Sequence, residues 1–105
     1  METVEFTVRL NKDCRRRHKH THIKGKTASF CIQLEIYHKN EWYPVIRYDT
    51  AHGFAHRDFV HFNGSIDKTT LFLQNYNEAL IFAEDDIKNN WELYREKFLR
   101  EADND

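Results

Sequence analysis

Residues 27–38 constrain the fold more than any other stretch, because apolar and polar residues alternate there without a break. Alternation with a period of two is typical of a strand that has one buried and one exposed face. The apolar set on one side consists of Ala28, Phe30, Ile32, Leu34 and Ile36. We therefore expect this segment to be a half-buried strand within a sheet.

Three further segments carry strand signals. Residues 2–10 alternate in the same way, and residues 42–50 and 54–62 are strand-like hydrophobic runs. Lys39-Asn40 is predicted to close a hairpin, since Asn tolerates positive φ. Pro44 cannot donate to a ladder, so it is expected at a bulge or where its nitrogen faces no partner. The four strands are expected to pair in chain order as an antiparallel meander.

From Asn75 to Ala102 the hydrophobic period changes to that of a helix. Apolar residues recur at steps of three and four, at Leu80, Ala83, Ile87, Trp91, Tyr94 and Phe98. Asn75 or Asn77 can cap this helix, and Glu78 suits its first turn. The sequence thus predicts one α+β domain over residues 1–105, a four-stranded antiparallel β-meander with a long C-terminal helix packed on one face.

The net charge of −1 is the sum of a basic segment near the N-terminus and an excess of acidic residues from Glu78 onward. Residues 11–26 show no apolar period and are predicted to form a long basic loop or arm. We expect this arm to be loosely ordered until RNA binds. Its candidate nucleic-acid-binding residues are Arg15, Arg16, Arg17, Lys19, Lys24 and Lys26. The alternatives are a solvated, mobile arm with no ligand, and a metal site formed by Cys14, His18, His20 and His22.

The stretch from Arg47 to Asp58 reads R-Y-D-T-A-H-G-F-A-H-R-D. A two-residue turn at His52-Gly53 would place Asp49 opposite His56 and Arg47 opposite Asp58. Because side chains alternate along a strand, these four residues would share one face. In the same register that face also carries the apolar residues of the strands. The helix is therefore expected to cover its apolar half and to leave the charged end open.

A histidine beside a carboxylate can act as a general acid or base, and an adjacent arginine can stabilise charge on a phosphate. The candidate catalytic residues are therefore Arg47, Asp49, His52, His56 and Asp58. Two other interpretations stay open. Asp49, His56 and Asp58 are ordinary ligands for a divalent metal. The same side chains could also form cross-strand ion pairs that contribute little to stability.

The segment V-I-R-Y-D-T-A-H-G-F-A-H-R-D, between a strand hairpin and a long helix, resembles small prokaryotic toxins of the TumE-like type. The shared positions are Arg47, Tyr48, Asp49, His52 and His56, whereas Asp58 stands where a further histidine is more usual. The resemblance implies a cytosolic toxin that is encoded beside an antitoxin and directed at RNA.

These observations predict an RNA-directed protein, a ribonuclease of toxin type. The alternative is a non-catalytic module that binds nucleic acid or a protein partner, in which the hairpin charges are structural. RNA, an antitoxin and a second copy of the chain are the expected partners. The sequence shows neither a signal-peptide pattern nor a membrane-spanning run, and Cys14 and Cys31 are expected as reduced thiols, so a cytoplasmic location is expected.

Overall fold

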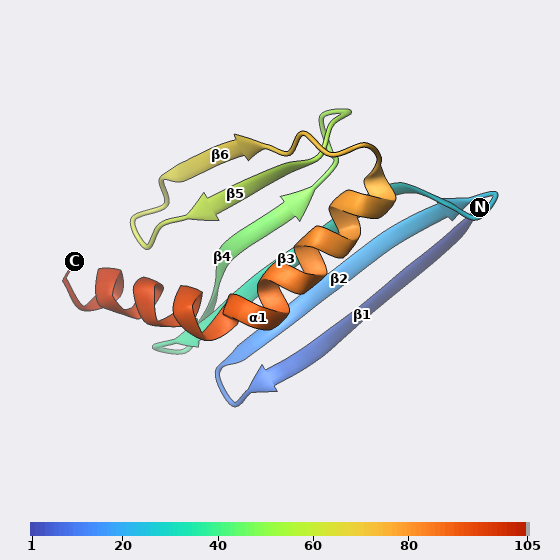
Figure 1. Ribbon diagram of the computed structural model, residues 1–105. Helices are drawn as coiled ribbons and strands as arrows, with labels where there is room; N and C mark the ends of the chain where they lie inside the picture. The colour runs from blue at the N-terminus through green and yellow to red at the C-terminus, as the bar shows by residue number, and fades with distance from the viewer. Residues whose placement is uncertain (105) are drawn as a thin grey trace.

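The computed structural model describes residues 1–104 and shows an antiparallel sheet of six strands with one long helix against it (Figure 1). The elements are β1 (Glu2–Asn11), β2 (Cys14–Ile23), β3 (Lys26–His38), β4 (Glu41–Asp49), β5 (His56–Val60), β6 (Ile66–Thr70) and α1 (Tyr76–Asp103). The strands lie in the sheet in chain order. The predicted α+β class and meander are confirmed, but the prediction of four strands is wrong.

The basic segment is a strand rather than an arm. β2 lies between β1 and β3 and pairs with both along its length. Its side chains do alternate, but both sets are polar: Arg15 and Arg17 point to one face, and Arg16 and His18 to the other. A hydrophobic period therefore cannot reveal this strand. The predicted loose arm is wrong, because the backbone of β2 is engaged in ladders on both of its edges.

The sixth strand follows the Asn63-Gly64 turn, in a stretch where the sequence predicted neither a strand nor a helix. Gly64 has a φ of 91°, and the His61 N–H donates to the Ser65 carbonyl at 2.8 Å, which closes a hairpin. Asn-Gly is a strong hairpin signal, and it correctly marks this turn. β6 is short and fully exposed, so no apolar pattern accompanied the signal.

Helix α1 begins as the sequence predicts. The Asn75 side chain caps it and accepts a hydrogen bond from the Glu78 N–H at 2.9 Å. The helix lies across β3 and β4 on one side of the sheet (Figure 1). Its buried residues are Ala79, Leu80, Ala83, Ile87 and Phe98. Past its middle, Arg95 forms a bidentate ion pair with Asp13, 2.7 and 2.9 Å long, in the β1–β2 turn.

A bulge in β4 decides which side chains meet the helix. Tyr43 faces Ile36 as predicted, but the register then shifts at Pro44 and Val45, so that Ile46 rather than Val45 faces Leu34. One extra residue in a strand reverses the faces of everything beyond it. Tyr48 therefore lies toward α1 in the core.

The bulge also makes one expectation about the charged residues wrong, namely that they lie on the sheet face that the helix partly covers. Arg47 and Asp49, and with them His56 and Asp58, lie on the sheet face opposite α1. We call this side the open face, because no helix of the described chain covers it (Figure 1). The face that carries Ile46, Tyr48 and Phe59 is the one that α1 covers.

Candidate functional site on the open face

The open face carries a chain of polar contacts that crosses the sheet from β1 to β6. The Arg9 and Arg15 guanidinium groups lie 5.6 and 3.9 Å from the centre of the Trp42 ring. On the other side of Arg15, the network continues through Glu35, Gln33, Arg47, Asp58 and Lys68. Because these residues come from separate strands, tertiary pairing alone assembles the network.

Glu35 is the centre of the cationic half. It is only 4% exposed, and its carboxylate accepts from Arg15 Nε at 2.6 Å, from Arg17 Nη1 at 3.5 Å and from Gln33. A buried carboxylate needs such partners to offset the loss of hydration. Glu35 thus fixes where two arginines stand on the open face.

His56 is the centre of the other half. Its Nε2 lies 2.9 Å from Asp49 Oδ1 and 3.8 Å from Asp58 Oδ2, while Arg47 Nη1 lies 4.0 Å from Asp58. The predicted pairing of Asp49 with His56 and of Arg47 with Asp58 is confirmed. The His56 side chain is only 1% exposed, and its Nδ1 has no hydrogen-bond partner among the described residues.

The loop before His56 covers its ring. The predicted two-residue turn at His52-Gly53 is wrong, because residues 50–55 form a longer loop although the strand register is as predicted. The loop is attached to β3 instead of closing on β5: the Thr50 N–H donates to the Phe30 carbonyl at 3.2 Å. His52 stacks on His56 with ring centroids 5.5 Å apart, and Phe54 lies 5.7 Å from it.

All five candidate catalytic residues are therefore brought together at one end of the open face. His56 is buried and held by carboxylates, whereas His52 is exposed above it. A metal centre finds no support here, since no three His, Cys, Asp or Glu side chains in residues 1–104 are arranged to hold an ion. The set offers imidazole, carboxylate and guanidinium groups, which can move a proton beside a bound anion.

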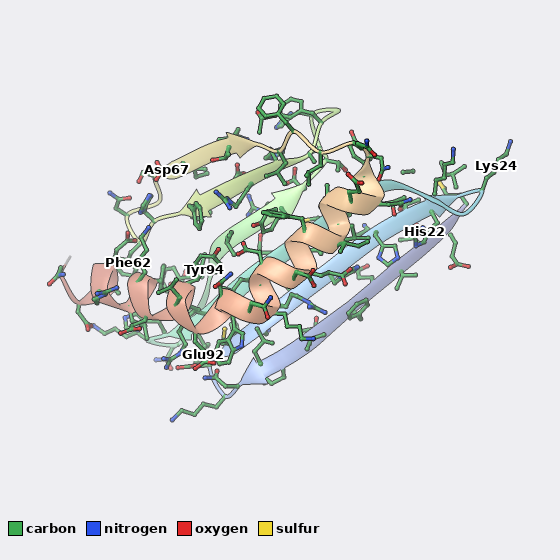
Figure 2. The ribbon with its side chains drawn as sticks, viewed as in Figure 1. His22, Lys24, Phe62, Asp67, Glu92 and Tyr94 are labelled. Carbon is green, nitrogen blue, oxygen red and sulfur yellow. The ribbon has the colours of Figure 1, made fainter. Side chains whose placement is uncertain are left out.

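The six candidate RNA-binding residues do not form one continuous surface. Arg15, Arg17 and Lys19 lie on the open face, and Arg16 lies on the opposite side. Lys24 occupies the β2–β3 turn at the far tip of the sheet (Figure 2), and Lys26 opens β3 beside it. Only the first three residues can act together with the histidine cluster.

A hollow of about 390 Å³ lies over β1, β2 and β3, around Arg17 and Lys19. Its lining includes Glu5, Thr7, Arg17, Lys19, Cys31 and Gln33. Burial raises the pKa of the Cys31 thiol, with nearby Asp49 adding to the effect, so this thiol is a poor nucleophile at neutral pH. The hollow therefore has the size of a ligand site but offers polar contacts rather than thiol chemistry.

Sequence reasoning missed Gln33, Glu35, Trp42 and Lys68 as members of the network. The first two occupy the polar side of the clearest strand and could have been noticed there. Trp42 joins them through the Lys39-Asn40 hairpin, and Lys68 follows the Asn63-Gly64 turn. The contacts of Trp42 with Arg15 and of Lys68 with Asp58 depend on β2 and β6, which the sequence did not predict as strands.

Polar clusters on the helix side connect α1 to the sheet. Asp86 accepts hydrogen bonds from the hydroxyls of Tyr48 and Tyr94, the latter at 2.6 Å, and burial followed by these bonds raises both tyrosine pKa values. Tyr94 points from the helix toward the sheet in Figure 2. At the C-terminal end of α1, His61 contacts Asp67 at 2.6 Å and Glu101 at 2.7 Å. These clusters position the helix and lie away from the open face.

Comparison with known proteins places the chain in a family. Residues 1–104 match the model of a domain of unknown function, DUF7718. The chain belongs to the DUF7718 family. Searches of the curated proteins and of the solved structures find no match. This DUF7718 domain has no helix in residues 1–104 with the length and apolarity needed to cross a membrane.

Proposed function

We propose that this DUF7718 protein is RNA-directed: it holds RNA across the open face, and the histidine cluster cleaves the bound strand. The supporting observation is that Arg47, Asp49, His56 and Asp58 share a face with Arg15, Arg17 and Lys19, and that His52 stacks on His56. Separate strands supply the two groups, so one surface offers both backbone binding and proton transfer.

Binding would use the least engaged cations. The Arg17 side chain is 54% exposed although it contacts Glu35, and Lys19 is exposed beside it. Such groups neutralise phosphates and release condensed counterions, which makes affinity depend on salt. The hollow next to them is large enough for a small polar ligand and would receive one nucleotide of the strand.

Cleavage would be a transesterification that needs no added oxidant or reductant. The ribose 2′-hydroxyl attacks the adjacent phosphorus, and one imidazole takes its proton. The 5′-oxygen leaves with a proton from the other imidazole, which yields a 2′,3′-cyclic phosphate and a 5′-hydroxyl. Asp49 orients His56, His52 is the exposed partner, and Arg47 stabilises the charge on the phosphate.

A non-catalytic RNA-binding module is the second candidate. It is favoured by the burial of His56, whose side chain is 1% exposed beneath His52 and Phe54. In that case the cluster of His56 with Asp49 and Asp58 would stabilise the hairpin, and the protein would act by occupying RNA. Cleavage requires the loop at residues 50–55 to move aside.

The binding proposal is tested by the double substitution Arg17→Ala and Lys19→Ala on the open face. The matched control, Lys88→Ala with Arg100→Ala, removes the same charge from exposed positions of α1. For single-stranded RNA, each lost phosphate contact lowers the slope of log affinity against log salt by about 0.7, so the first variant is expected to lose about 1.4. Equal losses in both variants would show that binding is not located on the open face.

The cleavage proposal is tested by incubating the protein with total RNA, with and without a chelator. Cleavage should persist with the chelator, leave cyclic phosphate ends, and disappear in His52→Ala and His56→Ala. Both variants should still bind RNA, because the cations of β2 are untouched. Binding without cleavage by the wild-type protein would support the second candidate.

The toxin interpretation is a further part of this proposal and rests on the R-Y-D-T-A-H-G-F-A-H segment. Expression of the wild-type chain should then arrest bacterial growth, and co-expression of a small helix-turn-helix partner encoded next to it should restore growth. His56→Ala should be harmless if arrest depends on cleavage. Arrest by an otherwise folded His56→Ala protein would instead indicate that RNA binding is sufficient.

A further inference from the structure

The two edges of the sheet are built very differently. β6 has five residues, all of them exposed, and carries Asp67 and Lys68. Short edge strands with charged residues resist pairing with other chains. β1 has ten residues without proline, and β2 is its only neighbour in the sheet of residues 1–104. Apart from an irregularity between Arg9 and Asn11, this edge is long and regular, and such an edge is a template for another strand.

The sequence of β1 is complementary to itself. If two copies pair antiparallel with Thr7 opposite Thr7 of the second copy, Glu5 falls opposite Arg9. The same register places Val4 opposite Leu10 and Phe6 opposite Val8. Opposite charges and apolar pairs directly across from one another stabilise an antiparallel ladder. Glu5 and Arg9 are both exposed at this edge and belong to the open face.

Other registers lack this match. Centring the pair on Phe6 or Val8 leaves both charges opposite uncharged residues, and centring it on Glu5 or Arg9 sets like charges against each other. A shift by one residue would place charged side chains opposite apolar ones, because alternate residues occupy opposite faces. The Thr7 register alone satisfies both faces of the strand.

We propose that β1 is a homodimer interface, in which two copies of this chain pair their β1 strands antiparallel about Thr7. The two-fold axis then stands perpendicular to the sheet, so both α1 helices lie on one side and both open faces on the other. The apolar row of Val4, Phe6 and Val8, half-buried or exposed in one chain, gains the matching row of its partner. The dimer is a twelve-stranded sheet with one continuous open face, and it forms whether or not that face binds RNA.

Sedimentation equilibrium of the full chain tests this interface. The wild-type protein is expected as a dimer, at twice the 12.8 kDa of one chain. Glu5→Arg or Arg9→Glu alone turns two symmetric attractions into two repulsions and should weaken the dimer at least about tenfold. The double variant restores opposite charges and should restore the dimer. A wild-type chain that stays monomeric up to its solubility limit, or single variants that leave the dimer intact, would overturn the proposal.

A crosslinking experiment tests the register separately. In a Cys31→Ser background, Thr7→Cys places a thiol on the two-fold axis and should give a disulfide-linked dimer on mild oxidation. Thr69→Cys on the β6 edge is the matched control and should stay uncrosslinked. Circular dichroism of each variant shows that it is folded. Equal crosslinking at both edges would indicate random collision rather than a β1 interface.

Discussion

Acid should destabilise this protein through one buried histidine, His18. Its side chain stacks on Phe6 with ring centroids 4.4 Å apart, its Nε2 lies 2.6 Å from Nδ1 of His20, and it is 3% exposed. Burial, with the charges of His20 and Arg16 adding to it, lowers the pKa of His18 from 6.5 to about 4. The folded state therefore favours the neutral form of the His18 imidazole.

The size of the effect follows from this difference in pKa. A histidine whose native pKa lies below its unfolded value stabilises the fold above pH 6.5 and loses that contribution as the pH falls toward 4. The shift corresponds to about 3 kcal/mol in total, of which about 2 kcal/mol is lost between pH 7 and pH 5. For a domain of this size that is a large part of the total stability.

Urea unfolding of the wild type and of His18→Phe at pH 7 and pH 5 measures this contribution. Phenylalanine keeps the stack on Phe6 but cannot titrate, and its loss of the bond to His20 costs about 1 kcal/mol at both pH values. The variant should therefore lose about 2 kcal/mol less than the wild type on acidification. Other titrating groups are common to both proteins and cancel in this difference. Equal losses would refute the argument that His18 is held neutral by burial.

Two further predictions concern the contacts that anchor the helix. Hydrogen bonding to Asp67, then to Glu101, raises the pKa of His61. The contribution of His61 to the stability of the fold is therefore complete below pH 6.5 and is lost as the pH rises through the higher native pKa. A titration of His61 by NMR should show that Asp67→Asn lowers this pKa. Tyr48→Phe removes a buried hydroxyl that donates to Asp86, and thermal unfolding should report a loss of about 1–3 kcal/mol, whereas a change near zero would mean that the remaining partners satisfy the carboxylate.

Local patterns in the sequence determined much of this protein. The helix and its cap at Asn75 follow from periodicity and capping chemistry, which depend on residues within a few positions of one another. The pairing of Asp49 with His56 and of Arg47 with Asp58 was predicted from a two-residue turn, and the longer loop at residues 50–55 keeps the two strands in that same register. The candidate cluster could therefore be predicted from the sequence alone.

Only the tertiary structure decided on which face this cluster lies. The bulge at Pro44 and Val45 depends on how β4 meets β3, and it turns Arg47 away from the helix. β2 likewise becomes a strand because β1 and β3 supply hydrogen bonds to both of its edges, although its own side chains show no apolar period. Pairing between distant segments is stabilised by their combined burial and hydrogen bonding, and no single segment carries that information.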